Sequence, residues 1–159
     1  MMLTETCPGA LLRPAIRPFD PTKILVVDDD VEVVNALRRR LIQQGFEVLT
    51  AKNGAQGRSL ARRHRPDLIL LDLRLPDVDG LKLCQELTDS PTTCGIPVIL
   101  ISGCDHADVI QQSREAGCEY FLRKPYDPNV LLRLVRHALK ASRSWPHAER
   151  GRMTAYSRP

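Results

Sequence analysis

The sequence predicts an α/β fold in which helices cover both faces of a doubly wound parallel β-sheet. Two observations favour this fold. Five short aliphatic runs alternate with five segments of helical periodicity between Lys23 and about Ala141, and such alternation is typical of parallel strands joined by right-handed crossovers. The chain has 159 residues, 43% of them hydrophobic, which fits one globular domain. No apolar run approaches the ~20 residues that a membrane-spanning helix needs.

The first strand and helix follow directly from the pattern of the chain. The run KILVV predicts a strand over residues 23–27. Residues 31–44 predict a helix, because valines and leucines recur on one of its sides at helical spacing. Asp30 is suited to cap the start of this helix, and Gly45 is suited to end it.

The middle of the chain continues the same alternation. The run EVLTA predicts a strand over 47–51, and residues 54–64 predict a basic helix with small residues. A strand follows over 67–73, where the nearly continuous apolar run indicates burial on both faces. Residues 80–89 predict the next helix, and PVILIS predicts a strand over 97–102.

The last three elements complete the body. Residues 105–116 predict a largely polar helix that Gly117 ends, and EYFLRK predicts a strand over 119–124. Residues 128–141 predict a helix, since their apolar residues recur at i, i+3, i+4, i+7 and i+8. Asp127 is suited to cap this helix, and a proline is suited to its first turn.

The two ends of the chain differ from the body. Residues 1–22 contain four prolines and little periodicity, which indicates an irregular arm. They do not resemble a signal peptide. Residues 142–159 contain four arginines and one glutamate, so we expect a basic, flexible tail. The five cysteines are an odd number without a C-x-x-C pair, so we expect core cysteines in a reducing compartment.

Polar side chains collect where the predicted strands end. They are Asp28, Asp29 and Asp30 after the first strand, Asp72 in the third, Ser102 in the fourth and Lys124 in the fifth. The carboxyl ends of parallel strands share one edge of the sheet, where ligands bind. Carboxylates that converge repel one another unless a cation such as magnesium lies between them. A lysine and a hydroxyl suit phosphoryl oxygens, and an aspartate can act as the nucleophile.

Four motifs make the chain resemble the receiver domains of two-component response regulators. The motifs are ILVVDDD (24–30), LILLDLRLPDVDG (68–80), VILIS (98–102) and FLRKP (121–125). The resemblance implies a flavodoxin-like (βα)5 fold, a three-layer sandwich with strand order 2-1-3-4-5. It also implies a stand-alone receiver over residues 23–141, between the arm 1–22 and the tail 142–159.

The resemblance implies roles for the acidic residues. Asp72 corresponds to the phosphoacceptor of the family. Asp28 and Asp29 correspond to the acidic pair that positions Mg²⁺ (or Mn²⁺), with Asp29 as the more direct ligand. Arg74 would contribute its backbone carbonyl to the metal, and its bulky side chain could shield the acyl phosphate or guide the attacking water.

The resemblance also implies a switch. Ser102 corresponds to the hydroxyl residue that follows the phosphoryl group, and Lys124 to the lysine that contacts it. The bond between Lys124 and Pro125 is usually cis in the family. Phe121 corresponds to the aromatic residue that turns inward on activation, whereas Tyr120 should face the other way.

The function implied is phosphorelay signalling in the cytoplasm. A sensor histidine kinase or a histidine phosphotransfer protein would donate the phosphoryl group. The chain would act as no enzyme beyond its own phosphotransfer and autodephosphorylation. Its output would be a protein target that binds the surface of the fourth helix, fifth strand and fifth helix. Neither a membrane nor a nucleic acid is expected as a partner, and the chain would be a monomer or a phosphorylation-dependent dimer.

Three alternatives remain open from the sequence. The arginines of the basic tail could bind nucleic acid, or the domain could be a phosphorylation-independent scaffold. The segment DVDG (77–80) also matches the D-x-D-G loop of haloacid-dehalogenase-like phosphatases, with Asp77 as nucleophile. That loop should directly follow a hydrophobic strand. Here Leu75 and Pro76 come before it, and a proline is expected to end a strand.

Overall fold

The sheet has the predicted composition and order. A computed structural model describes residues 20–103 and 107–144. Its sheet contains five strands in the order β2-β1-β3-β4-β5, and all neighbouring pairs are parallel. The strands are β1 (Lys23–Val27), β2 (Glu47–Ala51), β3 (Leu68–Asp72), β4 (Val98–Ser102) and β5 (Tyr120–Arg123). The predicted α/β fold class and the 2-1-3-4-5 order are therefore confirmed.

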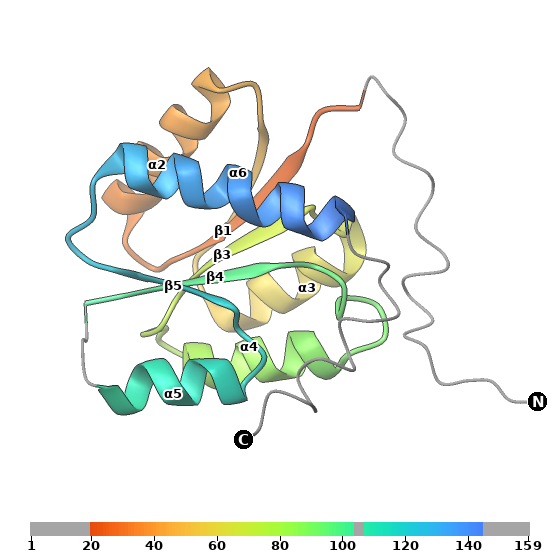
Figure 1. Ribbon diagram of the computed structural model, residues 1–159, viewed down its shortest axis with the longest axis vertical. Helices are drawn as coiled ribbons and strands as arrows, with labels where there is room; N and C mark the ends of the chain where they lie inside the picture. Colours follow the sequence, from red (N-terminus) through yellow and green to blue (C-terminus); the bar gives the residue numbers. More distant parts are fainter. Residues whose placement is uncertain (1–19, 104–106, 145–159) are drawn as a thin grey trace, which may run out of the picture.

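Helices cover both faces of the sheet and form the outer layers of the sandwich. Helices α2 and α6 lie on one face, and α3, α4 and α5 lie on the other (Figure 1). Their bounds are α2 (Val31–Gln43), α3 (Gly54–His64), α4 (Gly80–Asp89), α5 (Ala107–Glu115) and α6 (Pro128–Ser144). Helix α6 extends three residues beyond the predicted end at 141.

Alternate residues of the central strands supply the two halves of the core. In β3, Leu68 and Leu70 pack on the side of α2 and α6, and Ile69 and Leu71 pack on the other side. All four are at most 1% exposed. Each fully buried side chain of this kind stabilises the fold by roughly 1.5–3 kcal/mol. The apolar run before Asp72 therefore anchors that residue at the end of a rigid strand.

The predicted helix boundaries have identifiable causes. The Asp30 side chain accepts hydrogen bonds from the backbone amides of Glu32 and Val33, which confirms the cap of α2. Gly45 and Gly117 both have positive φ, of 90° and 87°, which glycine adopts without strain. The helix before the fifth strand is predicted to begin at residue 105, and this start lies outside the described residues. Most of the predicted arm and tail also lie outside them.

The cysteines only partly match the expectation. Cys84 and Cys118 are free and buried, as expected for core residues. Cys94, in contrast, is disulfide-bonded, which the sequence argument did not foresee. Among the described residues, no helix combines the length and the apolar character that crossing a membrane requires.

Candidate metal centre

The register of the sheet brings the predicted polar residues to one edge. Val27 pairs with Leu71, so Asp28 follows β1 beside the end of β3, where Asp72 is the last residue. Ser102 ends β4 and pairs with Arg123, which directly precedes Lys124. The Lys124 amide also donates a 2.8 Å hydrogen bond to the Ser102 carbonyl. Four strand ends separated in sequence thus meet at one place.

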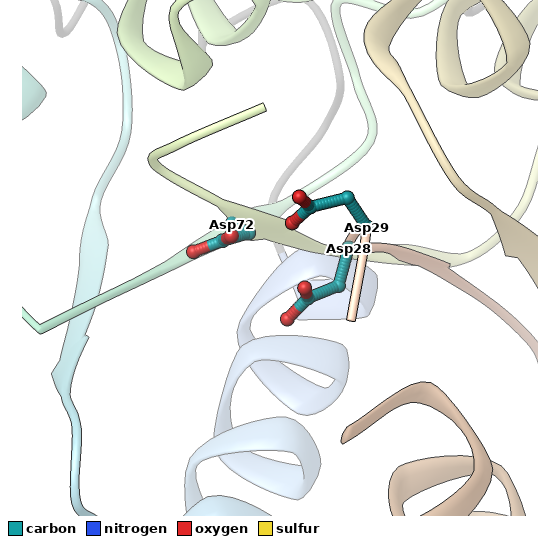
Figure 2. A group of neighbouring side chains, drawn as sticks. All are labelled: Asp28, Asp29 and Asp72. Atoms are coloured by element: carbon teal, nitrogen blue, oxygen red, sulfur yellow. The ribbon is translucent and has the colours of Figure 1, made fainter. Parts of the chain in front are cut away.

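Three carboxylates form the centre of this edge. One oxygen from each of Asp28, Asp29 and Asp72 lies within 4.8 Å of the others. Figure 2 shows Asp28 and Asp29 side by side after β1, with Asp72 beside them on β3. Asp28 is buried, at 4% exposure, whereas Asp29 is exposed. The site is therefore open to solvent on the side of Asp29.

Lys124 lies between two of these carboxylates. Its Nζ is 3.4 Å from Asp28 Oδ2 and 3.4 Å from Asp72 Oδ1. Burial lowers the pKa of the Lys124 amine, but the two carboxylates outweigh it, so the pKa lies above its ordinary value. Burial and the nearby Asp28 charge raise the pKa of Asp72. Lys124 lowers this pKa but offsets only part of the increase. The edge holds more negative than positive charge.

The donor set fits a divalent cation. Hard carboxylate oxygens with room for water are the ligands that Mg²⁺ prefers in proteins. A cation among Asp28, Asp29 and Asp72 would also offset the burial and the Asp28 charge that raise the Asp72 pKa. These three aspartates could therefore hold a metal ion.

The neighbouring aspartates of the first loop have different tasks. Asp28 accepts a 2.9 Å hydrogen bond from the Asp30 amide, which holds its carboxylate at the edge of the sheet. Asp30 instead turns toward α2 and caps that helix. The run DDD thus combines helix capping with the candidate metal centre, as expected for Asp30 and Asp28.

The segment after Asp72 folds back tightly. The Gly80 amide donates a 2.7 Å hydrogen bond to the Leu73 carbonyl, and Arg74 pairs with Asp79 in an isolated antiparallel bridge. A Cβ atom at Gly80 would lie 2.4 Å from the Asp72 carbonyl oxygen, so only glycine fits there. The Arg74 backbone lies close enough to the Asp72 carboxylate to lower its pKa, against the larger effects of burial and the Asp28 charge. Arg74 therefore lies beside the candidate metal centre.

Asp77 has a structural contact that the sequence argument missed. Its Oδ1 and Oδ2 accept hydrogen bonds of 2.7 Å and 3.0 Å from the Gly54 and Ala55 amides. These amides begin α3, on another part of the chain. An aspartate near an unsatisfied helix N-terminus is the signal for such a contact, but the sequence does not reveal which helix is near.

The remaining candidate residues lie around this edge. Ser102 is 2% exposed at the end of β4. Phe121 is half-buried on the side of α3, α4 and α5, and Tyr120 packs on the opposite side against His137 of α6. The two aromatic residues thus face opposite ways, as the resemblance implied. The Lys124–Pro125 bond is cis.

Fold and site together define a class of protein. The 2-1-3-4-5 sheet with an acidic, metal-compatible edge beside a lysine is a flavodoxin-like α/β domain with a ligand site at the carboxyl ends of its strands. The family model described as response regulator receiver domain matches residues 24–136. The chain therefore belongs to the family of response regulator receiver domains. Members of this family receive phosphoryl groups from histidine kinases and act on downstream targets.

Known relatives agree with this assignment. Response regulator PleD of Caulobacter vibrioides is 42% identical over 114 residues, which cover 72% of this chain and 25% of PleD. Protein PilH of Pseudomonas aeruginosa is 33% identical over 117 residues, which cover 74% of this chain and 97% of PilH. The chain spans only 25% of the length of PleD and 52% of the length of the transcriptional regulator RpaA of Synechocystis.

Solved structures agree on the fold. The CheY-like receiver domain protein of Methanospirillum hungatei JF-1 has a TM-score of 0.74 at 26% identity, over 78% of this chain and 98% of that one. The receiver domain of RstA from Klebsiella pneumoniae, in its BeF3-activated form, has a TM-score of 0.68 at 31% identity, over 75% and 99% of the two chains.

Proposed function

We propose that this domain accepts a phosphoryl group on Asp72, with Mg²⁺ or Mn²⁺ held by Asp28, Asp29, Asp72 and the Arg74 carbonyl. The donor is a phosphohistidine on a sensor kinase or on a phosphotransfer protein. One observation carries the proposal: three carboxylates converge within 4.8 Å, and the Lys124 amine bridges two of them at 3.4 Å. A partly buried cluster of this kind is costly unless it serves binding or chemistry.

In the proposed reaction an Asp72 oxygen attacks the phosphorus atom of the donor. The phosphorus–nitrogen bond breaks, a phosphorus–oxygen bond forms at Asp72, and the histidine ring leaves with the electron pair and takes up a proton. The bound cation would neutralise charge on the phosphoryl oxygens. Lys124 would move its amine from the Asp72 carboxylate to a phosphoryl oxygen, and Ser102 would donate its hydroxyl hydrogen bond to another.

The response to phosphorylation would start at Ser102 and Lys124, because both lie at the ends of strands β4 and β5. When Ser102 moves toward the phosphoryl group, Phe121 gains room to turn inward. Phe121 is only half-buried, which leaves a second packing available to it. The surface formed by α5, β5 and α6 would then change and recruit a protein target.

The proposal excludes turnover of external substrates. Its chemistry consists of phosphotransfer to its own Asp72 and the later hydrolysis of that acyl phosphate. The proposed monomer or phosphorylation-dependent dimer is tested by light scattering before and after phosphorylation.

Mass spectrometry tests this proposal. The protein is incubated with Mg²⁺ and a small phosphodonor such as acetyl phosphate, and the intact mass is measured. We expect one added phosphoryl group that is lost in base, that needs the divalent cation and that is absent after chelation with EDTA. An unmodified wild-type protein, or an adduct that persists in Asp72→Asn, contradicts the proposal.

A further inference from the structure

The loop between β3 and α4 is attached to a helix on the neighbouring part of the sheet. Its Asp77 accepts hydrogen bonds from the Gly54 and Ala55 amides at the start of α3, at 2.7 Å and 3.0 Å. The third amide of this turn, from Gln56, is bound at 2.8 Å by the cap residue Asn53. Thus two of the first three amides of α3 are satisfied from outside the helix, by the loop that follows Asp72.

Packing fixes the same contact from the apolar side. A Cβ atom at Gly54 would lie 2.1 Å from Val78 Cγ1 and 3.2 Å from Asp77 Oδ1. Val78 is also packed against the hydrophobic cluster on the side of α3 and α4. The tip of the loop therefore lies directly on the first turn of α3, and the absence of a side chain at Gly54 makes this approach possible.

The base of the same loop is joined to the candidate metal centre. Arg74 and Asp79 form an antiparallel bridge, and the Gly80 amide bonds to the Leu73 carbonyl at 2.7 Å. The Arg74 backbone also lies close enough to the Asp72 carboxylate to lower its pKa, although burial and the Asp28 charge raise that pKa overall. Asp77 comes only three residues after Arg74, so a short stretch of backbone connects the tip of the loop to Arg74.

We propose that Asp77 is a positioning residue for the metal. By holding the tip of the loop on α3, it keeps the Arg74 backbone carbonyl beside Asp72 in the arrangement that binds a divalent cation. The inference rests on the proposed function, in which that carbonyl is a ligand. Residues that orient metal ligands without touching the metal commonly change its affinity 10–100-fold when removed. Here the connection passes through the backbone, so an effect near the lower end of that range is expected.

The contact also predicts a reciprocal effect on α3. If the Asp77 contact favours metal binding, metal binding must favour the Asp77 contact by the same factor. Amide hydrogen exchange at Gly54 and Ala55 should therefore slow when Mg²⁺ is added to the wild-type protein. The amide of Gln56 is bonded to Asn53, within the helix, and should respond less.

Magnesium titration of three variants tests the inference. The full chain is titrated with Mg²⁺ alone, by calorimetry or by NMR shifts, in wild type, Asp77→Ala, Asp77→Asn and Asn53→Ala. We expect roughly tenfold weaker binding for Asp77→Ala. Asp77→Asn should fall in between, because its amide oxygen can still accept one hydrogen bond. Asn53→Ala is the matched control, since it removes a cap from the same turn of α3 without altering the loop.

The outcomes separate this inference from the proposed function. If wild type binds no Mg²⁺, both fail. If wild type binds Mg²⁺ but Asp77→Ala binds it equally well, only the role of Asp77 is refuted. Equal weakening by Asn53→Ala and Asp77→Ala also refutes it, since general loosening of α3 would then explain the loss. Circular dichroism and hydrogen exchange confirm that each variant is folded, and exchange at Gly54 and Ala55 should no longer respond to Mg²⁺ in Asp77→Ala.

Discussion

Asp72 and Asp77 are five residues apart, yet their surroundings are opposite. The Asp72 side chain is 11% exposed and lies against Asp28 and Lys124, and burial and the Asp28 charge raise its pKa. Asp77 is exposed, but hydrogen bonds from the Gly54 and Ala55 amides lower its pKa. The Asp72 carboxylate is surrounded by charge that a cation can balance, whereas both oxygens of Asp77 accept hydrogen bonds from backbone amides.

This difference supports the proposal that Asp72, and not Asp77, accepts the phosphoryl group. An aspartate whose two oxygens hold the start of a helix in place is less available as a nucleophile, because attack would break a bond that supports the fold. Asp77 is in that position, which argues against the phosphatase interpretation of DVDG. Asp72 lies at the end of a buried strand with the cation-compatible cluster around it. The role of each carboxylate therefore follows from its neighbours and not from its sequence motif.

The largest expected effect concerns Asp72, the proposed phosphoacceptor. Asp72→Asn should abolish phosphorylation completely, since the amide that replaces the carboxylate is not a nucleophile at neutral pH. Asp77→Asn should still become phosphorylated, although more slowly if metal binding is weaker. Intact mass after incubation with Mg²⁺ and acetyl phosphate distinguishes the two variants. A phosphorylated Asp72→Asn, or loss of all modification in Asp77→Asn, would reverse the contrast between the two residues.

The next effect concerns Gly80, which lies where the loop between these residues closes. In Gly80→Ala the new Cβ would meet the Asp72 carbonyl oxygen at 2.4 Å and the Leu73 Cα at 2.7 Å. Neither backbone atom can rotate away, so we expect the free energy of unfolding to fall by about 2–3 kcal/mol. Chemical denaturation measures this change. Gly57→Ala serves as control, because its new Cβ would meet only the Val27 side chain, at 3.0 Å, and should cost less.

Lys124 sharpens the comparison from the side of Asp72. Lys124→Met removes the amine that lies 3.4 Å from both Asp28 and Asp72, so two close carboxylates lose their positive neighbour. We expect the free energy of unfolding at neutral pH, without metal, to fall by about 1–2 kcal/mol. The loss should shrink when Mg²⁺ is added, because the cation replaces part of the missing charge. If Lys124→Met were as stable as wild type in EDTA, the contacts of Lys124 with Asp28 and Asp72 would contribute little to stability.

Much of the fold could be predicted from the sequence because its signals are local. A continuous apolar run predicts the buried strand Leu68–Asp72, and Asp30, as a cap residue, predicts the start of α2. The candidate metal centre was also predictable, since strand ends converge at one edge of a parallel sheet. Asp28 and Asp72 are far apart in sequence, but the strand order alone brings them together.

What could not be predicted depends on distances between elements. The contact of Asp77 with α3 joins residues 22 and 23 positions apart, and no periodicity encodes it. The three-residue extension of α6 has a similar origin, since Ser142 is buried and Arg143 donates to the Thr22 hydroxyl. At the end of α6, these tertiary contacts extend the helix beyond the point that its sequence pattern predicts.

The smallest expected effect, and the most direct test of the contrast, is the pH dependence of stability. For Asp72 the folded pKa is raised above the ordinary value of 3.8, so the folded state binds the proton more tightly than the unfolded state. Wild type should therefore lose stability relative to Asp72→Asn as the pH rises from below 3.8 through the raised pKa.

For Asp77 the folded pKa is lowered, and the pH dependence of its contribution to stability is reversed. Its stabilisation is present above 3.8 and is lost as the pH falls through the lowered pKa. Urea denaturation between about pH 3 and pH 7, in EDTA, measures both differences. If the stability contributions of Asp72 and Asp77 changed with pH in the same direction, the surroundings of these carboxylates would differ less than their contacts indicate. Opposite directions would assign charge chemistry to Asp72 and a structural role to Asp77.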